Sequence, residues 1–192
     1  MLVYSPTYEG HLLHLRTAFE VLRQHALYAK KSQCSFGTQE IEYLGHLITA
    51  AGVSTDPKNV IAMKDWPTPT TIKELRGFLG LTGYYRGFIK DYGLMSKPLT
   101  ELLKKDAFHW PPQARLAFEA WKRAMLSASV LALPDFTKSF VVETDASGAE
   151  IGAVLMQKGH PIAYFSKALA VKHQSLSTYE RQLMAVVMAV EK

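Results

Sequence analysis

Apolar residues recur at helical spacing through the first two thirds of the chain. Between residues 9 and 29 the apolar side chains, from Leu12 to Ala26, share one side and predict an amphipathic helix. Proline in a first helical turn at Pro57 and a Thr-x-x-Glu capping box at Thr71 mark two further helix starts. The helices predicted after the first cover residues 56–64, 71–90, 95–104 and 112–127.

Short apolar segments bounded by turn residues predict strands on either side of this helical region. Ahead of it, two strands are expected at residues 34–36 and 41–48, with a turn at 37–39. Beyond Pro134, strands are expected at residues 139–144, 151–157 and 161–166, and a helix from Ser177. Two prolines in Trp66-Pro67-Thr68-Pro69-Thr70 enforce an extended linker. The predicted fold class is α+β.

The helix expected at residues 71–90 is unusual in its glycine content. Its glycines are Gly77, Gly80, Gly83 and Gly87. Each glycine lowers the stability of a helix by up to about 1 kcal/mol relative to alanine, so four of them in one helix require an explanation. On a helical projection the last three lie within roughly 60° of one another, and Lys73, Arg76 and Tyr84 project into the same sector. This glycine face suits either close approach to a nucleic-acid minor groove or tight packing against another helix. The spacing favours neither interpretation.

Two carboxylates in the last third are candidate metal ligands. Asp145 follows an apolar strand, where a rigidly held carboxylate suits a hard cation such as Mg²⁺. An aspartate in an Asp-x-x-Gly sequence more often forms a turn with its own backbone. When Asp145 is considered by itself, this interpretation is favoured. Glu180 lies at capping-box spacing from Ser177, so it either caps its own helix or supplies a second ligand. Two-metal chemistry needs more carboxylates, and Glu143 and Glu150 have no evident reason to converge with this pair.

Charge and composition narrow the class of protein. Of the 192 residues, 22 are Lys or Arg and 17 are Asp or Glu, which gives a net charge of +5. All of this excess lies in residues 1–134, which suits a phosphate-backbone partner, whereas residues 135–192 are neutral. The single cysteine, Cys34, excludes an internal disulfide framework and a cysteine-rich zinc site. No apolar run approaches membrane-helix length, and the N-terminus has no secretory signal, so we expect a soluble, intracellular chain.

Several motifs follow one another along the whole chain. The first set is Tyr43-Leu44-Gly45-His46, Trp66-Pro67-x-Pro69, Phe78-Leu79-Gly80-Leu81-x-Gly83-Tyr84-Tyr85-Arg86-x-Phe88-Ile89, Lys97-Pro98-Leu99-Thr100-x-Leu102-Leu103 and Phe108-x-Trp110. The second set is Thr144-Asp145-Ala146-Ser147, Gly152-Ala153-Val154-Leu155 and Tyr179-Glu180-x-x-Leu183-Met184-Ala185-Val186-Val187. In this order the sequence resembles the reverse transcriptase, followed by the beginning of the ribonuclease H domain, in the Pol polyprotein of gypsy-class long-terminal-repeat retrotransposons.

The resemblance implies a division of the chain and a set of site residues. It implies a palm end with a primer-grip hairpin (1–65), thumb helices (66–108), a connection helix (109–134) and the first half, three strands and a helix, of a ribonuclease H-like fold (135–192). The implied nucleic-acid-binding residues are Tyr43, Leu44, Gly45, His46, Lys73, Arg76, Gly80, Gly83, Tyr84 and Gly87. Asp145 and Glu180 match the first two acidic ligands of a two-Mg²⁺ ribonuclease H site. The implied partners are an RNA–DNA hybrid or DNA template–primer and the remainder of the Pol polyprotein, and not a membrane.

The chain also departs from the family pattern. The polymerase Tyr-x-Asp-Asp strand and any Asp-Asp pair are missing, and the later acidic residues of the ribonuclease H domain are missing too. We therefore expect a fragment of Pol that contacts template–primer but neither polymerises DNA nor cleaves RNA alone. The alternative is a non-catalytic retroelement relic that acts as a nucleic-acid or protein interaction module.

Overall fold

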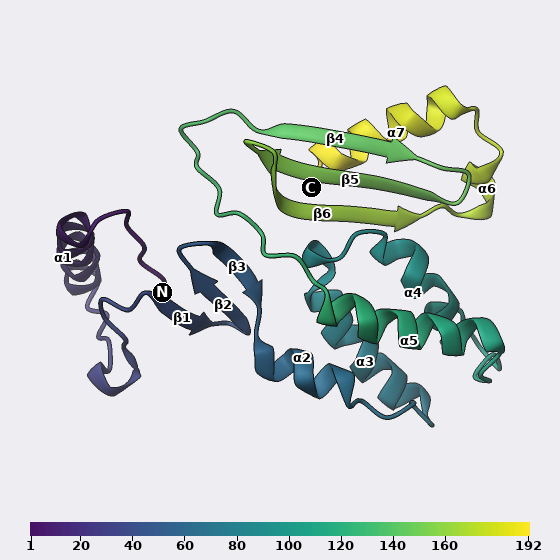
Figure 1. Cartoon of the computed structure of the whole chain (residues 1–192), viewed down its shortest axis with the longest axis horizontal. Coiled ribbons are helices and arrows are strands. Elements are labelled where there is room, and N and C mark those ends of the chain that lie inside the picture. Colours follow the sequence, from purple (N-terminus) through teal and green to yellow (C-terminus); the bar gives the residue numbers. More distant parts are fainter.

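The computed structural model describes residues 1–192 as a mixed arrangement of helices and two sheets. The helices are α1 (Tyr8–Gln24), α2 (Pro57–Lys64), α3 (Ile72–Tyr84), α4 (Tyr92–Glu101), α5 (Pro112–Leu126), α6 (Val171–Gln174) and α7 (Thr178–Val190), with 3₁₀ turns η1 (Lys31–Gln33) and η2 (Arg86–Phe88). The strands are β1 (Glu40–Tyr43), β2 (His46–Thr49), β3 (Gly52–Thr55), β4 (Val141–Ala146), β5 (Glu150–Gln157) and β6 (His160–Ala168). The α+β prediction is confirmed at this level (Figure 1).

The first sheet is an antiparallel meander of β1, β2 and β3. Its first hairpin turns at Leu44 and Gly45, which have φ of 49° and 73°. Two consecutive positive φ values are typical of the tight turn that joins twisted antiparallel strands. The prediction of a strand at 34–36, joined by a turn at 37–39 to the next strand, is wrong because residues 34–39 contain no strand, and β3 was missed. An apolar residue at the first turn position made residues 41–48 look like one continuous strand.

The main core lies among the four central helices (Figure 1). Its 14 buried apolar residues run from Met63 in α2 to Leu131 beyond α5. Trp121 is fully buried, packs edge-on against Tyr92, and donates from Nε1 to the Ser96 hydroxyl at 3.2 Å. The proline linker before α3 packs on these helices, because Trp110 Nε1 donates to the Pro69 carbonyl at 2.9 Å.

The predicted helix at residues 71–90 is shorter than expected. α3 ends at Tyr84, and the chain continues through the 3₁₀ turn η2. Glycine destabilises the helix here, and the Tyr85 hydroxyl donates instead to the Gly45 carbonyl in the turn of the first sheet. The side of this segment opposite the glycines faces the core, since Leu75 and Phe78 are fully buried with Tyr85, and Phe88 is buried as well. Gly87 therefore lies outside the helix that carries the other glycines.

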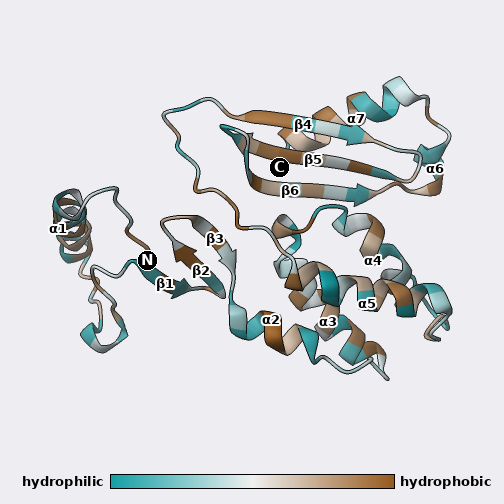
Figure 2. Ribbon diagram, viewed as in Figure 1, coloured by the Kyte–Doolittle hydropathy of each residue, from teal (hydrophilic) through white to brown (hydrophobic).

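The second sheet, in the order β4-β5-β6, lies between two groups of helices. α7 packs across β4 and β5, while α4 and η2 contact β6 (Figure 1). A small core of Ile151, Leu169 and Ala185 joins this sheet to α7. β4 is an edge strand with a hydrophobic, exposed beginning at Val141, and Figure 2 shows this segment in brown. The predicted three strands and final helix are thus present.

The N-terminal segment contributes nothing to either core, because no residue before Gly52 is buried. α1 has the predicted apolar stripe but ends at Gln24, five residues earlier than expected, and none of its residues is buried. A groove of about 1280 Å³ separates α1 from β1 and is lined by residues such as Phe19, Phe36 and Ile41.

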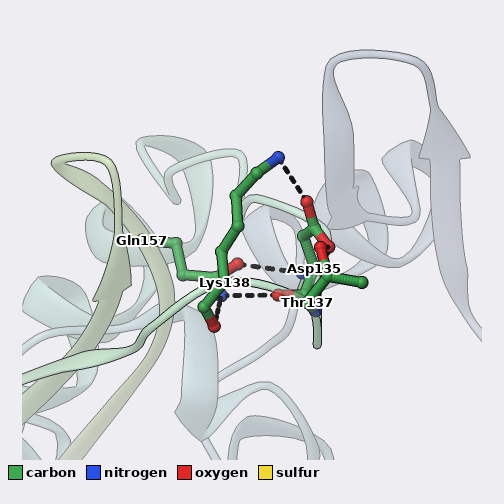
Figure 3. A network of polar contacts seen from close by, with 4 residues as sticks. All are labelled: Asp135, Thr137, Lys138 and Gln157. Carbon is green, nitrogen blue, oxygen red and sulfur yellow. Dashed lines mark hydrogen bonds and ion pairs between the residues drawn. The ribbon is translucent and has the colours of Figure 1, made fainter.

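A polar network fastens the connection between α5 and β4 to the sheet (Figure 3). Gln157, at the end of β5, accepts from the Asp135 N–H at 2.9 Å and donates to the Asp135 carbonyl at 2.8 Å. The Asp135 carboxylate accepts from Lys138 Nζ and from the Thr137 hydroxyl. Hydrogen bonds from Lys138 first, and then from Thr137, hold the pKa of Asp135 well below its ordinary value of 3.8.

Replacing Asp135 with Asn tests this network through pH. A carboxylate with a lowered native-state pKa stabilises the fold above the pKa of the unfolded chain and loses that contribution as pH falls toward the native value. We expect Asp135→Asn to lower the free energy of unfolding at neutral pH, and the difference from the parent to shrink once pH falls below 3.8. Urea unfolding across pH measures this. The exposed Glu143→Gln is the control, and a difference that does not change with pH contradicts the account.

Candidate nucleic-acid interface and acidic pair

One exposed stripe runs along α3. Its residues share one side of the helix and are all exposed: Lys73, Arg76, Gly77, Gly80 and Tyr84. A Cβ atom built on Gly77 or Gly80 would have no other atom within 4 Å. At Gly77 and Gly80 the helix is therefore not packed against another helix of this chain, and this α3 stripe is a surface open to solvent.

The remaining predicted glycines differ from these two. A Cβ on Gly83 would lie 3.3 Å from the Tyr92 hydroxyl, so α4 approaches that position. Gly87 has open space around it but belongs to η2 rather than to α3. Of the glycines in the predicted site, Gly80 is the one that lies in the middle of the open stripe.

Two neighbouring tyrosines join α3 to the turn between β1 and β2. The Tyr85 hydroxyl donates to the Gly45 carbonyl at 2.6 Å and accepts from Asn59 Nδ2 of α2 at 2.8 Å. The Tyr84 hydroxyl donates to the Leu44 carbonyl. Tyr85 is fully buried, whereas Tyr84 is 52% exposed. The structure thus brings two separately predicted segments, the hairpin and the glycine helix, into direct contact.

His46 is enclosed by aromatic rings at this junction. Its ring stacks on Tyr84 and Phe88, with centroids 5.2 and 5.3 Å away, and meets the edge of Tyr85 at 5.6 Å. Burial lowers the pKa of His46, so the neutral imidazole is favoured. His46 and Tyr43 are only partly exposed, while Leu44 is 70% exposed at the tip of the turn. Of these four hairpin residues Leu44 is therefore the exposed one, whereas Gly45, like His46, is only partly exposed and lies against the aromatic side chains.

Asp145 and Glu180 lie on neighbouring elements but are each engaged locally. Asp145 is exposed near the end of β4, and its Oδ1 accepts from the adjacent Ala146 N–H at 2.8 Å. Glu180 Oε2 accepts from the Ser177 N–H at 2.8 Å, and the Ser177 hydroxyl accepts from the Glu180 N–H at 3.3 Å. This capping box starts α7, and hydrogen bonding to the side chain and backbone of Ser177 lowers the pKa of Glu180.

The acidic pair is too small to form a metal site by itself. No three His, Cys, Asp or Glu side chains lie close enough together to hold an ion. A two-metal phosphodiester site needs several carboxylates to hold ions about 3.5–4 Å apart. Mg²⁺, on which the ribonuclease H family generally depends, does not fit these two residues alone.

Glu150 is a functional candidate that sequence reasoning missed. It is only 8% exposed, and its Oε1 accepts from the Leu94 N–H at 2.9 Å. Glu150 begins β5 and Leu94 lies in the first turn of α4, 56 residues earlier in the chain. No local pattern could pair them, because only the docking of α4 on the sheet brings them together.

Comparison with known sequences places the chain in a family. Residues 110–192 match the family described as the RNase H-like domain found in reverse transcriptase. The whole chain is 38% identical to the retrovirus-related Pol polyprotein from transposon 297 of Drosophila melanogaster, and 34% identical to that from transposon gypsy. Over 67% of its length it is 51% identical to an uncharacterized mitochondrial protein of Arabidopsis thaliana, of which it covers 82%.

Solved structures show the same fold. The foamy viral protease-reverse transcriptase in complex with RNA/DNA hybrid has a TM-score of 0.86 at 24% identity, covering 97% of this chain and 26% of that one. The same protein in complex with dsDNA gives 0.84, covering 98% and 41%.

Residues 110–192 belong to the RNase H-like domain found in reverse transcriptase, and the whole chain is homologous to a segment of retrotransposon Pol polyproteins. It spans 18% of the length of the transposon 297 polyprotein and 20% of the gypsy polyprotein. None of its helices combines the length and hydropathy that crossing a bilayer requires.

The two tyrosines allow a matched test of the junction. Tyr85→Phe removes a buried hydroxyl and leaves the Gly45 carbonyl and the Asn59 amide without their partner, at a cost of about 1–3 kcal/mol. Tyr84→Phe removes a half-exposed hydroxyl that water can replace, so we expect a loss of roughly 0–1 kcal/mol. Urea unfolding of both variants measures the difference. Equal losses would show that the Tyr85 hydroxyl has no special role.

Proposed function

We propose that this chain is a duplex-binding segment of a retrotransposon reverse transcriptase/ribonuclease H, and that it holds an RNA–DNA hybrid or DNA template–primer along the α3 stripe and the Leu44–Gly45 turn. The open space around Gly77 and Gly80 is the observation that carries this proposal. Glycine in a helix interior is destabilising, and nothing inside this chain occupies the space that the missing side chains leave.

The shape of the α3 stripe suits the minor groove of an RNA–DNA hybrid. An A-form minor groove is wide and shallow, so a helix surface without side chains can approach its floor. Lys73 and Arg76 would lie beside the flanking phosphates, which position a protein without reading sequence. The excess positive charge of residues 1–134 supports the same partner, because it would attract a phosphate backbone.

The turn between β1 and β2 would act as the primer grip that the family resemblance implies. Its two carbonyls are already held by the hydroxyls of Tyr84 and Tyr85. A prearranged turn loses little conformational freedom when a duplex binds. His46 would contribute by supporting Tyr84, rather than by contacting phosphate as a cation.

The segments would divide this work as the resemblance suggests. Residues 1–65 would supply the palm end and primer grip, 66–108 the thumb, and 109–134 the connection, with 135–192 as half of a ribonuclease H-like domain. The foamy viral reverse transcriptase, described in complexes with dsDNA and with RNA/DNA hybrid, supports both classes of nucleic acid as candidates.

Asp145 and Glu180 would provide two ligands of a ribonuclease H-type site without cleaving RNA on their own. The local engagement of Glu180 in its capping box and the lack of a third acidic neighbour support binding without cleavage. The same observation favours the alternative, a non-catalytic retroelement module that binds nucleic acid or the remainder of a Pol polyprotein.

A leucine placed on the α3 stripe tests the proposed surface. Gly80→Leu would hold the helix away from the groove, and we expect the dissociation constant for an RNA–DNA hybrid to rise about tenfold, or about 1.4 kcal/mol. Fluorescence anisotropy with a labelled hybrid measures this. Gln113→Leu adds the same side chain to an exposed, uncharged position on α5 and should leave affinity unchanged.

Salt dependence separates a phosphate contact from a general loss of charge. Arg76→Ala should reduce the slope of log affinity against log salt by about 1, as expected for one lost phosphate contact. Lys172→Ala removes one exposed charge from α6 and should not change the slope. Equal affinities for the parent, Gly80→Leu and Gln113→Leu, or no binding by the parent, would refute the proposed surface.

A further inference from the structure

We infer that Glu150 is a positioning residue that fixes the Asp145 end of the second sheet against the helices that carry the α3 stripe. This inference rests on the proposed function for its consequence, because it concerns where Asp145 would lie along a bound duplex. The contact that Glu150 makes between α4 and the second sheet, called the Glu150 joint below, is present in the free chain.

The Glu150 side chain caps a helix of another part of the fold. Asp91 precedes α4 with a φ of 58°, and its side chain makes no capping hydrogen bond. Glu150 Oε1 accepts instead from the Leu94 N–H in the first turn, at 2.9 Å. A negative carboxylate is favourable at the positive end of a helix, and this one is buried, so its hydrogen bond is costly to lose.

A second bond and a close backbone approach complete the joint. The Gly93 N–H donates to the Ser166 hydroxyl of β6 at 2.7 Å. A Cβ atom on Gly93 would lie 2.7 Å from the Ala168 nitrogen and 2.9 Å from the Lys167 Cα. Backbone atoms cannot move aside as a flexible side chain can, so α4 can lie this close to β6 only with glycine here.

The backbone of Glu150 holds the other half of the joint. The Glu150 N–H donates to the Ser147 hydroxyl at 3.0 Å, and the Glu150 carbonyl accepts from the Ser147 N–H at 2.9 Å. These bonds close the turn that directly follows Asp145 and Ala146 on β4. One residue therefore binds α4 through its side chain and the Asp145 turn through its backbone.

The consequence is a fixed spacing between two surfaces. α4, α3 and α5 share one core, so holding α4 to the sheet holds the α3 stripe as well. If a duplex lies along the α3 stripe, the joint decides which part of that duplex faces Asp145. Loss of the joint would allow the position of Asp145 along the bound duplex to vary, while the α3 stripe itself would remain intact.

Distance measurement in the free chain tests the joint directly. Spin labels at Glu119→Cys on α5 and Tyr179→Cys on α7, in a Cys34→Ser background, report the placement of the sheet relative to the helices by double electron–electron resonance. We expect a narrow distribution for the parent and for Glu150→Gln, which keeps a carbonyl oxygen as acceptor. Glu150→Ala should broaden the distribution and shift its mean, whereas the exposed Glu143→Ala should not.

A parent-like distribution in Glu150→Ala overturns the proposal. If Glu150→Ala does not fold, Gly93→Ala decides, because its Cβ would force α4 away from the β6 backbone and would also crowd Glu150 Oε1, 3.0 Å away. A broadened or shifted distribution then supports the joint, and an unchanged one overturns it.

A second measurement places Asp145 on nucleic acid. An iron–EDTA chelate attached at Asp145→Cys, again with Cys34→Ser, cuts nearby nucleotides of a bound RNA–DNA hybrid. We expect a short window of cuts with Glu150 or Gln at this position, and a wider or displaced window in Glu150→Ala at unchanged affinity. An unchanged window in Glu150→Ala contradicts the positioning role. If no protein binds the hybrid, the proposed function fails, while the spin-label distances still judge the joint.

Discussion

The Tyr85 hydroxyl group is the contact on which the arrangement of the first half of the protein depends. It lies where three segments meet, donating to the Gly45 carbonyl of the hairpin turn and accepting from Asn59 of α2. Because the ring is fully buried among the core side chains of α3, the turn is fixed to the helix bundle rather than merely near it. The exposed Tyr84 and the turn then form one continuous surface with the α3 stripe.

That surface conflicts with what helix stability alone would select. Gly77 and Gly80 weaken α3, and the space above them is empty, so no internal packing offsets their cost. Departures from local preference of this kind are expected where a surface is shaped for a partner. Gly93 of α4 differs from them, because there the missing side chain allows close contact with β6 of the same chain.

Local signals in the sequence were sufficient for several elements and insufficient for others. Pro57 with its Asp56 cap, and Ser177 with Glu180, marked helix starts that the structure confirms. The turn at Leu44 was hidden because an apolar residue occupies a position of positive φ. For the candidate site, the sequence indicated the glycine face and the acidic pair. It could not indicate the tyrosine junction or the Glu150 joint, because their partners are 40 and 56 residues away.

Site-specific photo-crosslinking tests the central claim most directly. A benzophenone amino acid at Arg76, on the α3 stripe, should crosslink to a bound RNA–DNA hybrid. The same group at Leu116, which is 67% exposed on α5, should not. Crosslinks of equal yield from both positions, or from Leu116 alone, would show that the duplex lies elsewhere and would contradict the assignment of the α3 stripe.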